Sequence, residues 1–371
     1  MKVALLSFHN AANYGAALQA YALEKHLLEQ GIDCEYIDYR NHHRRTAYSM
    51  SYHIWENLKR KKIKNALKYF LGFPFMGLRK IRFKRFYKKN LRCTPKVYKS
   101  EEEAKELNPY YDKFIVGSDQ VWNFENNGGD FAFLLNFVDD DSKKISYSSS
   151  FGVSEIPLQI RDSYRQYLSK INKIAVREAY GVDIVKALTL REAKLVLDPV
   201  FLLSKQQWES LTPQKKIKES FVFFYANKSK QISDFFTRTK YRMNGKKLYK
   251  LARNTSVRDF FDNDIKVKYA MSPNEFIRVV RDSELVISAS FHCISLAIIL
   301  NKPFVAILTA DRGKDERILN ILNLLDLNNR ILTPDMGEVE INATIDYEKV
   351  NSKIRELCSD SINFLIDAIN N

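Results

Sequence analysis

The 371-residue sequence lacks several features that would place it in a particular class. Its four cysteines are scattered without a CxxC pair, which argues against a disulfide framework and a thiolate metal site. No apolar run approaches the roughly 20 residues that span a bilayer. The first residues lack the charged and apolar regions of a signal peptide, so the first apolar run is interpreted as a strand. These absences predict a soluble, cytoplasmic protein.

Several catalytic and cofactor-binding motifs are also missing. The loop after the first predicted strand is neither GxGxxG nor GxxxxGK[ST], which disfavours dinucleotide binding and Walker-type phosphate binding. No GxSxG or HExxH motif is present, and no HxH or DxD spacing lies near a predicted strand end. We therefore expect neither a metal nor an organic cofactor.

The net charge of +15 comes from one segment. Residues 41–100 hold 18 of the 59 basic residues and one of the 44 acidic ones, so this segment carries +17 and the rest of the chain −2. Its apolar residues have helical spacing, which predicts two basic amphipathic helices broken at 72–74. Two interpretations stay open, a helical hairpin that covers the first sheet and a surface that docks on an anionic membrane. Nucleic-acid binding is disfavoured because no recognition motif accompanies the charge.

Elsewhere, short apolar runs alternate with helical periods, which is typical of α/β folds. The runs predict strands at 3–8, 34–39, 114–117, 145–148, 173–176 and 195–197, and in a second set at 221–225, 247–251, 285–288, 304–308 and 330–332. Helices are expected at 18–30, ending at Gly31, and near 230–242, 273–282, 291–300, 315–326 and 347–369. We predict two Rossmann-like doubly wound domains that face a cleft. Their bounds are 1–203, with the basic insertion at about 41–100, and 204–345, followed by a C-terminal helix at 346–371.

The loop between the first strand and the first helix is small and polar. Asn13, Tyr14 and Gly15 lie at the predicted helix N-terminus, where free N–H groups and the helix dipole favour an anion. We therefore predict that these residues bind substrate. The alternative for Asn13 and Gly15 is turn geometry alone.

Polar residues follow the apolar run at 114–117. Asp119 and Gln120 are suited to bind sugar hydroxyls, and Trp122 to supply an apolar platform. Ligands of open α/β sheets bind at the carboxyl ends of the strands, so a substrate-binding role is predicted for Ser118, Asp119 and Gln120. The alternative is that Ser118 or Asp119 caps a helix.

Two neighbouring runs end in the same way. Ser149 follows the run at 145–148, and Arg177 follows the run at 173–176. An arginine at a strand end is suited to bidentate binding of a carboxylate or phosphate, with Glu178 as its orienting partner. Ser149 and Arg177 are therefore also predicted to bind substrate.

His292 is the only histidine beyond position 53, and it opens a helix directly after an apolar strand. A lone histidine is more often structural than catalytic, so both roles stay open at this stage. Arg317 and Lys314 lie near the start of the helix predicted at 315–326, where the dipole disfavours cations. This position suggests contact with an anion, and an ion pair with Asp315 or Glu316 is the alternative.

Five segments of the chain together resemble the polysaccharide pyruvyl transferase family. The resemblance runs in order from residue 1 to about 330, and its motifs are NYGAALQAYAL at 13–23, YDKFIVGSDQVWN at 111–123, VRE at 176–178, LDP at 197–199 and SFH at 290–292. It implies a two-domain fold similar to GT-B glycosyltransferases. It also implies transfer of pyruvate from phosphoenolpyruvate to a hydroxyl pair of a bacterial exopolysaccharide or capsule sugar, which gives a ketal and phosphate.

The resemblance assigns roles to two residues. By analogy Arg177 helps to hold phosphoenolpyruvate, and His292 is the general acid. The sequence departs from the family at Ser290, where better-known members have an arginine. Ser290 is still predicted to line the substrate site, and the missing cationic contact would then come from Arg317 or Lys314.

Two other functions stay open at this stage, a GT-B-type glycosyltransferase that uses a nucleotide sugar and a basic, non-enzymatic binding protein. For the transferase, the expected partners are phosphoenolpyruvate as donor substrate and a glycan acceptor, free or lipid-linked. Peripheral contact with the anionic inner face of the cell membrane is a further expectation. Nucleic acid is not expected as a partner.

Overall fold

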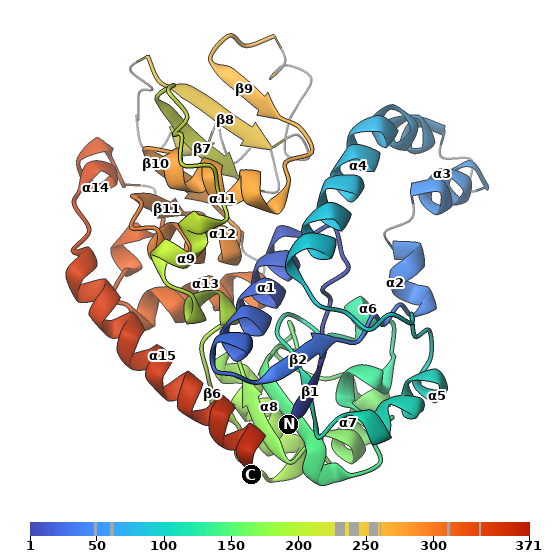
Figure 1. Cartoon of the computed structure of the whole chain (residues 1–371). Coiled ribbons are helices and arrows are strands. Elements are labelled where there is room, and N and C mark those ends of the chain that lie inside the picture. Colours follow the sequence, from blue (N-terminus) through green and yellow to red (C-terminus); the bar gives the residue numbers. More distant parts are fainter. Residues whose placement is uncertain are drawn as a thin grey trace. The chain divides into compact units, whose positions relative to one another are not determined.

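The computed structural model describes residues 1–47, 50–59, 63–226, 234–236, 245–251, 259, 261–309, 312–333 and 335–371. The chain forms two compact units (Figure 1). Unit 1 comprises Met1–Pro199 together with Ser361–Asn371, and unit 2 comprises Val200–Asp360.

Unit 1 is built on a six-stranded sheet in which all recorded strand pairs are parallel. The strand order is β2 (Asp33–Tyr36), β1 (Lys2–Leu6), β3 (Lys113–Val116), β4 (Lys144–Ser149), β5 (Lys173–Val176) and β6 (Lys194–Leu195). The central strands are apolar and buried, as expected for a parallel sheet with both faces covered. The order reverses between β1 and β3, which is the switch point of a doubly wound fold.

The helices of unit 1 connect these strands. Their bounds are α1 (Tyr14–Glu29), α2 (His42–Ala47), α3 (Met50–Lys59), α4 (Ile63–Asn90), α5 (Glu101–Ala104), α6 (Phe124–Asn127), α7 (Arg161–Leu168) and α8 (Ala179–Thr189). Helix α1 begins four residues before the predicted position because Asn13 caps it. It ends, as predicted, before Gly31, which has a φ of 76°.

Unit 2 contains a second sheet, whose recorded pairs are again parallel. The order is β11 (Phe304–Ala306), β10 (Leu285–Ser288), β7 (Phe221–Tyr225), β8 (Lys247–Leu251) and β9 (Ile265–Lys268). The switch point lies between β7 and β10, the strands on either side of the reversal. The helices are α9 (Lys205–Ser210), α11 (Pro273–Asp282), α12 (Phe291–Ile299), α13 (Arg312–Leu324), α14 (Glu338–Asn342) and α15 (Tyr347–Asn370).

Local sequence explains why α11 begins where it does. Ser272 and Glu275 form a capping box, in which each side chain binds the other residue's backbone N–H. Pro273 occupies the first helical turn, where its missing N–H has no cost. These signals confirm the helix predicted at 273–282.

Most predicted strands are confirmed, but two predictions fail at sheet edges. Residues 330–332, predicted as a strand, contribute only an isolated bridge between Ala306 and Ile331. The prediction missed β9, in which lysines alternate with Ile265 and Val267 at the edge of the sheet. An edge strand is half exposed, so it shows no continuous apolar run. The helix predicted near 230–242 lies mostly outside the described residues.

The basic segment forms α2, α3 and α4, and the predicted break at 72–74 is wrong. Helix α4 runs without interruption from Ile63 to Asn90. Pro74 removes a single N–H donor, which one long helix can tolerate where its remaining backbone hydrogen bonds persist. Phe83 and Phe86 are buried, and their rings contact Tyr14 and Tyr21 of α1 at centroid distances of 5.1 and 6.1 Å. This side of α4 therefore covers part of unit 1, as the helical-hairpin interpretation requires.

Helix α15 is divided between the units. Its residues up to Asp360 belong to unit 2, whereas Ser361–Asn371 complete unit 1. In unit 1, the backbone N–H of Leu197 donates to Oγ of Ser361 at 3.0 Å. The sequence placed the domain boundary at 203/204 and the terminal helix in a piece of its own. In the described parts of the chain, none of the helices combines the length and apolar character required to cross a membrane.

Candidate functional site

The residues predicted to bind substrate lie mainly in loops at the carboxyl ends of the strands. In doubly wound sheets this is where ligands bind, at the switch points. Ser118, Asp119 and Gln120 follow β3 at the switch point of unit 1. Ser290 and His292 follow β10 at the switch point of unit 2.

Hydrogen bonds connect the two loops at the switch point of unit 1. Ser7, directly after β1, donates from Oγ to the carbonyl of Ser118 at 2.9 Å. Gln19 of α1 donates from Nε2 to Oγ of Ser7 at 2.9 Å, and its Oε1 accepts the backbone N–H of Ser118 at 3.2 Å. All three residues are buried. The loop after β3 is thereby fixed against the first helix.

Gly117 allows this loop to lie against the end of β4. Its φ is 129°, and a Cβ atom added there would lie 2.0 Å from the carbonyl oxygen of Tyr147. Asp119 follows with a φ of 79° and forms an isolated bridge with Ser149. The carbonyl of Asp119 accepts the N–H of Ser150 at 3.0 Å. Only glycine permits this close approach of the two backbones.

Arg177 at the end of β5 is 3% exposed and lies in a cluster of carboxylates. It donates from Nη1 to Oδ2 of Asp198 at 2.6 Å and from Nε to Oε1 of Glu178 at 3.0 Å. Its Nη2 lies 3.9 Å from Oδ1 of Asp119. Ser118 adds a bond from its Oγ to Oδ2 of Asp198 at 3.2 Å.

The electrostatics of this cluster fix the charge of Arg177. Burial alone would lower the pKa of the guanidinium, but the charges of Glu178, Asp198 and Asp119 outweigh it and raise the pKa above its ordinary value. Nε and Nη1 of Arg177 donate to Glu178 and Asp198, so these two nitrogens are already bonded to carboxylates of the protein. In the structure, Arg177 therefore positions Asp198 next to Ser118 of the loop after β3, with Asp119 of the same loop 3.9 Å from its Nη2.

Asn13, Tyr14 and Gly15 form the start of α1. The side chain of Asn13 accepts the N–H of Gly15 at 2.9 Å, which makes it the N-cap of the helix. Tyr14 is buried, and the guanidinium of Arg79 from α4 lies 4.8 Å from its ring centroid. The turn-geometry alternative thus explains the contacts of Asn13, and substrate binding by these three residues stays a prediction.

Three further side chains near the β3 loop have structural partners. Ser149 is buried and donates from Oγ to the carbonyl of Val116 at 3.0 Å. Oε1 of Gln120 accepts from Nδ2 of Asn126 at 2.9 Å. The predicted apolar platform at Trp122 is wrong, because this side chain is fully buried and donates from Nε1 to the carbonyl of Phe133. The indole belongs to the core because the chain turns inward directly after the loop.

In unit 2 the loop after β10 places His292 in the first turn of α12. Ser288 donates from Oγ to the carbonyl of Tyr225 on β7, and its Oγ accepts the N–H of Ser290 at 3.0 Å. Ser290 occupies the N-cap position without a side-chain capping bond. His292 is 8% exposed, and its ring contacts Phe291 at a centroid distance of 5.1 Å. These bonds fix the start of α12 at the switch point.

Arg317 lies on α13, about one turn into the helix and partly buried. Asp315, one of the ion-pair partners considered for it, accepts hydrogen bonds at 2.9 Å from the backbone N–H and from Oγ1 of Thr309. The side chain of Lys314 lies outside the described residues.

The structure brings together part of the predicted site and adds residues that were missed. Ser118, Asp119, Ser149 and Arg177 gather at the ends of β3, β4 and β5, whereas His292 and Arg317 belong to unit 2. Asp198 was quoted in a motif but not assigned to the site, although it follows an apolar run as the others do. Nothing in the sequence singled out Ser7 and Gln19. Among the described residues, no group of three or more His, Cys, Asp or Glu side chains is arranged to hold a metal ion.

Comparison with known families identifies the chain. The family model described as "Polysaccharide pyruvyl transferase" matches residues 13–311, which is well over half of the 371-residue chain. The chain belongs to the polysaccharide pyruvyl transferase family. The match covers the loops after β3 and β10 and the Arg177 cluster. The search of curated proteins gave no match.

Solved structures show the fold that this transferase shares with other proteins. One is an α-glucosyltransferase in complex with UDP and a 13-mer DNA, with a TM-score of 0.50, 9% identity and coverage of 100% of both chains. UDP-N-acetylglucosamine 2-epimerase from Rickettsia bellii has a TM-score of 0.50 and 9% identity, over 100% of this chain and 97% of that one. At these identities the likeness shows the fold alone, two Rossmann-like domains of the GT-B type.

We expect Gly117→Ala to destabilise unit 1 strongly. The added methyl meets the Tyr147 carbonyl and also requires an unfavourable φ, so a loss of about 3 kcal/mol or more in the free energy of unfolding is expected. Urea unfolding followed by circular dichroism measures it. Gly31→Ala is the matched control, because its φ is also positive but no atom lies within 4 Å; it should cost only about 1–2 kcal/mol. Equal losses in both variants would contradict the close approach.

Arg177→Met should also be strongly destabilising, because it leaves buried carboxylates without their cation. A loss of about 3–5 kcal/mol in the free energy of unfolding is expected. The double variant Arg177→Met/Asp198→Asn should recover part of it, since one of the carboxylates is then neutral. Lys186→Met serves as control, because its ion pair with Glu192 is exposed and should contribute less than about 1 kcal/mol. No recovery in the double variant would argue against coupling of Arg177 to Asp198.

Proposed function

We propose that this transferase moves pyruvate from phosphoenolpyruvate to a hydroxyl pair of a bacterial exopolysaccharide or capsule sugar, forming a cyclic ketal and releasing phosphate. The family match over residues 13–311 is the observation that carries the proposal. The position of His292 supports it, because a histidine in the first turn after a switch-point strand lies where open α/β folds bind ligands.

The reaction needs one proton donor and a site for two anionic groups. His292 as imidazolium gives a proton to the methylene carbon of phosphoenolpyruvate, which makes C2 electrophilic. One acceptor hydroxyl adds to C2, and its proton replaces the one that His292 gave. A second hydroxyl then displaces phosphate from C2 and closes the ketal, and its proton leaves with the phosphate. This scheme consumes one phosphoenolpyruvate and one diol, and requires no resident cofactor.

The donor's carboxylate and phosphate need cations and free N–H groups. The start of α1 at Asn13, Tyr14 and Gly15 supplies the positive end of a helix dipole, with no acidic residue in the first turn, although the N–H of Gly15 is already bonded to the side chain of Asn13. Arg317 supplies a cation in unit 2 in place of the family arginine missing at Ser290. Arg177 contributes through the loop after β3: its Nη1 binds Asp198, which also accepts a hydrogen bond from Ser118, and its Nη2 lies 3.9 Å from Asp119.

The acceptor sugar is assigned to the loop after β3. The carboxylate of Asp119 and the side chain of Gln120 offer hydrogen-bonding groups for a hydroxyl pair. Ser118, which was also predicted to bind substrate, is fully buried and bonded within the protein, so it supports the loop from inside. Ser149 supports that loop from β4. The protein would act in the cytoplasm, where phosphoenolpyruvate is made, on a glycan acceptor that is free or still linked to its lipid carrier.

His292→Gln tests the role of the acid. We expect turnover to fall roughly 10²- to 10⁴-fold, because glutamine cannot give up a proton to carbon. The measurement is phosphate release from phosphoenolpyruvate with a set of acceptor oligosaccharides, and mass spectrometry of the product should show the added ketal. His26→Gln is the matched control, since His26 is also buried but lies at the end of α1 in unit 1.

Two outcomes would overturn the proposal. One is phosphate release by the His292→Gln variant at the wild-type rate. The other is release of UDP from a UDP-sugar without any need for phosphoenolpyruvate, which would instead identify a glycosyltransferase.

Arg317→Gln tests the source of the missing cationic contact. Loss of a charged hydrogen bond to the donor should raise the KM for phosphoenolpyruvate roughly 10- to 100-fold. Adding Ser290→Arg, which introduces the family residue, should restore much of the affinity. An unchanged KM in Arg317→Gln would exclude Arg317 as the donor's cationic partner. Arg281→Gln is the control, because the guanidinium of Arg281 is bonded to Asp282.

A further inference from the structure

The outer side of the basic helices carries a surface that the proposed reaction does not use. In α4, Phe83 and Phe86 face the rest of unit 1. Because successive helical residues are turned by about 100°, Ile81, Arg85 and Lys88 lie on the other side of the helix. Ile81 is 51% and Leu78 42% exposed, although both are apolar. Lys80, Lys84 and Lys89 are also exposed on this helix.

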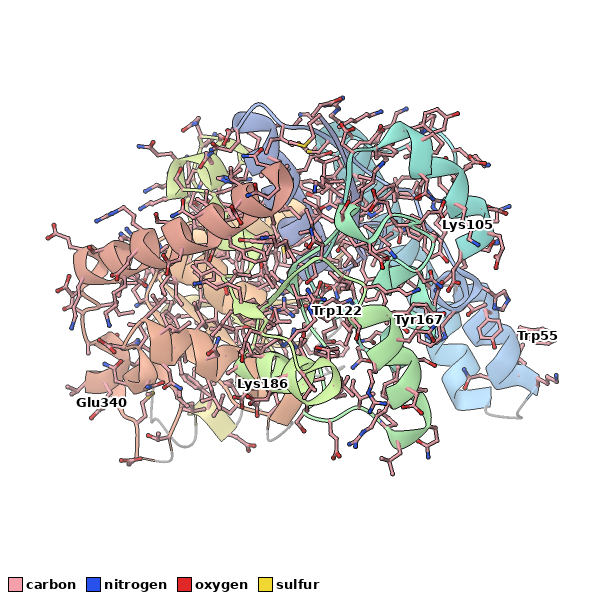
Figure 2. All side chains as sticks on the ribbon, turned by 90° about the horizontal axis from the view of Figure 1, so that it is seen from below. Trp55, Lys105, Trp122, Tyr167, Lys186 and Glu340 are labelled. Carbon is pink, nitrogen blue, oxygen red and sulfur yellow. The ribbon has the colours of Figure 1, made fainter. Side chains whose placement is uncertain are left out.

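Helix α3 adds further exposed apolar side chains. It packs beside α4 (Figure 1) and exposes Trp55 and Leu58, which are 58% and 53% exposed. Figure 2 shows Trp55 at the periphery of the molecule. The ammonium of Lys59 lies 5.1 Å from the centroid of the Trp55 ring. We use the name outer face for Trp55, Leu58, Lys59, Leu78, Ile81, Arg85 and Lys88.

The outer face has no counter-charge of its own. In the described part of the chain, Arg85 and Lys88 have no carboxylate within salt-bridge distance. Only one acidic residue occurs at 41–100, against 18 basic ones. A surface that exposes large apolar side chains among uncompensated cations matches a partner with an apolar interior and an anionic boundary.

We propose that the outer face docks on a bilayer of anionic phospholipids. Trp55, Leu58, Leu78 and Ile81 enter the boundary between headgroups and acyl chains, and Lys59, Arg85 and Lys88 bind the phosphates of the headgroups. A second copy of the chain is disfavoured, because a symmetric contact would bring two strongly basic segments together. Nucleic acid has the negative charge that the basic side chains would bind, but its phosphate backbone offers no apolar surface for the exposed leucine and isoleucine side chains.

The sequence provides a fluorescent probe for this contact. The chain has three tryptophans, of which Trp122 and Trp208 are fully buried, so Trp55 reports on the outer face. Phosphatidylcholine vesicles containing phosphatidylglycerol should shift its emission to the blue and sediment with the protein. Pure phosphatidylcholine vesicles should do neither, and added salt should weaken binding to the anionic vesicles. Trp55→Phe should abolish the shift.

Two pairs of variants separate charge from apolar contact. Arg85→Glu/Lys88→Glu should weaken binding at least roughly tenfold. Lys170→Glu/Lys194→Glu, with the same charge change at other exposed positions of unit 1, should weaken it much less. Trp55→Ser/Ile81→Ser should weaken binding roughly fivefold or more, because apolar surface can no longer be buried in the bilayer. Leu158→Ser, at a residue that is 73% exposed, is the control.

Three results would overturn the proposal. They are equal losses in the charge-reversed variant and its control, no effect of the two serine substitutions, and tighter binding to duplex DNA than to anionic vesicles. Circular dichroism of every variant verifies that it is folded. Vesicle binding is measured without substrates, so its failure would leave the proposed transferase reaction untouched.

Discussion

The buried ion cluster around Arg177 is the interaction on which the geometry of the candidate site in unit 1 depends. One guanidinium binds Asp198 and Glu178 and lies close to Asp119, so a single side chain connects the segments that follow β3, β5 and β6. Charges can be buried only when partners compensate for the loss of water. This requirement fixes the geometry, because moving any one of the loops would leave a charge without its partner. The hydrogen bonds from Ser7 and Gln19 extend the same constraint to α1.

The strands could be predicted from the sequence where burial requires a run of apolar residues. Strands β7 and β10 occupy the predicted residues, because continuous apolar runs occur where both faces of a sheet are covered. The same rule explains the failure at β9, an edge strand whose lysines reach water. The break predicted at 72–74 failed because proline disfavours a helix without forbidding one. Local preference is thus a weaker guide than the pattern of burial.

For the candidate site, the sequence identified the loops but not the partners of their side chains. Ser118, Asp119 and Arg177 were found because polar residues after buried strands must gather at one edge of a parallel sheet. Which carboxylate Arg177 binds depends on the strand order, and that order brings Asp198 to it from β6. The same dependence explains Trp122, whose position next to the site gave no sign that its ring belongs to the core. A sequence pattern predicts which side chains lie at the carboxyl edge of the sheet, but the strand order determines which of them bind one another.

Helix α15 has a consequence for how the protein is made. Because Ser361–Asn371 complete unit 1, that unit is discontinuous along the chain. During synthesis, residues 1–199 leave the ribosome long before the segment that binds Leu197 is translated, and unit 2 is complete first. The six-stranded sheet must therefore persist for a time without its last partner. Its hydrogen-bonded loops and ion cluster, all formed within residues 1–199, are the contacts available to hold it together during that interval.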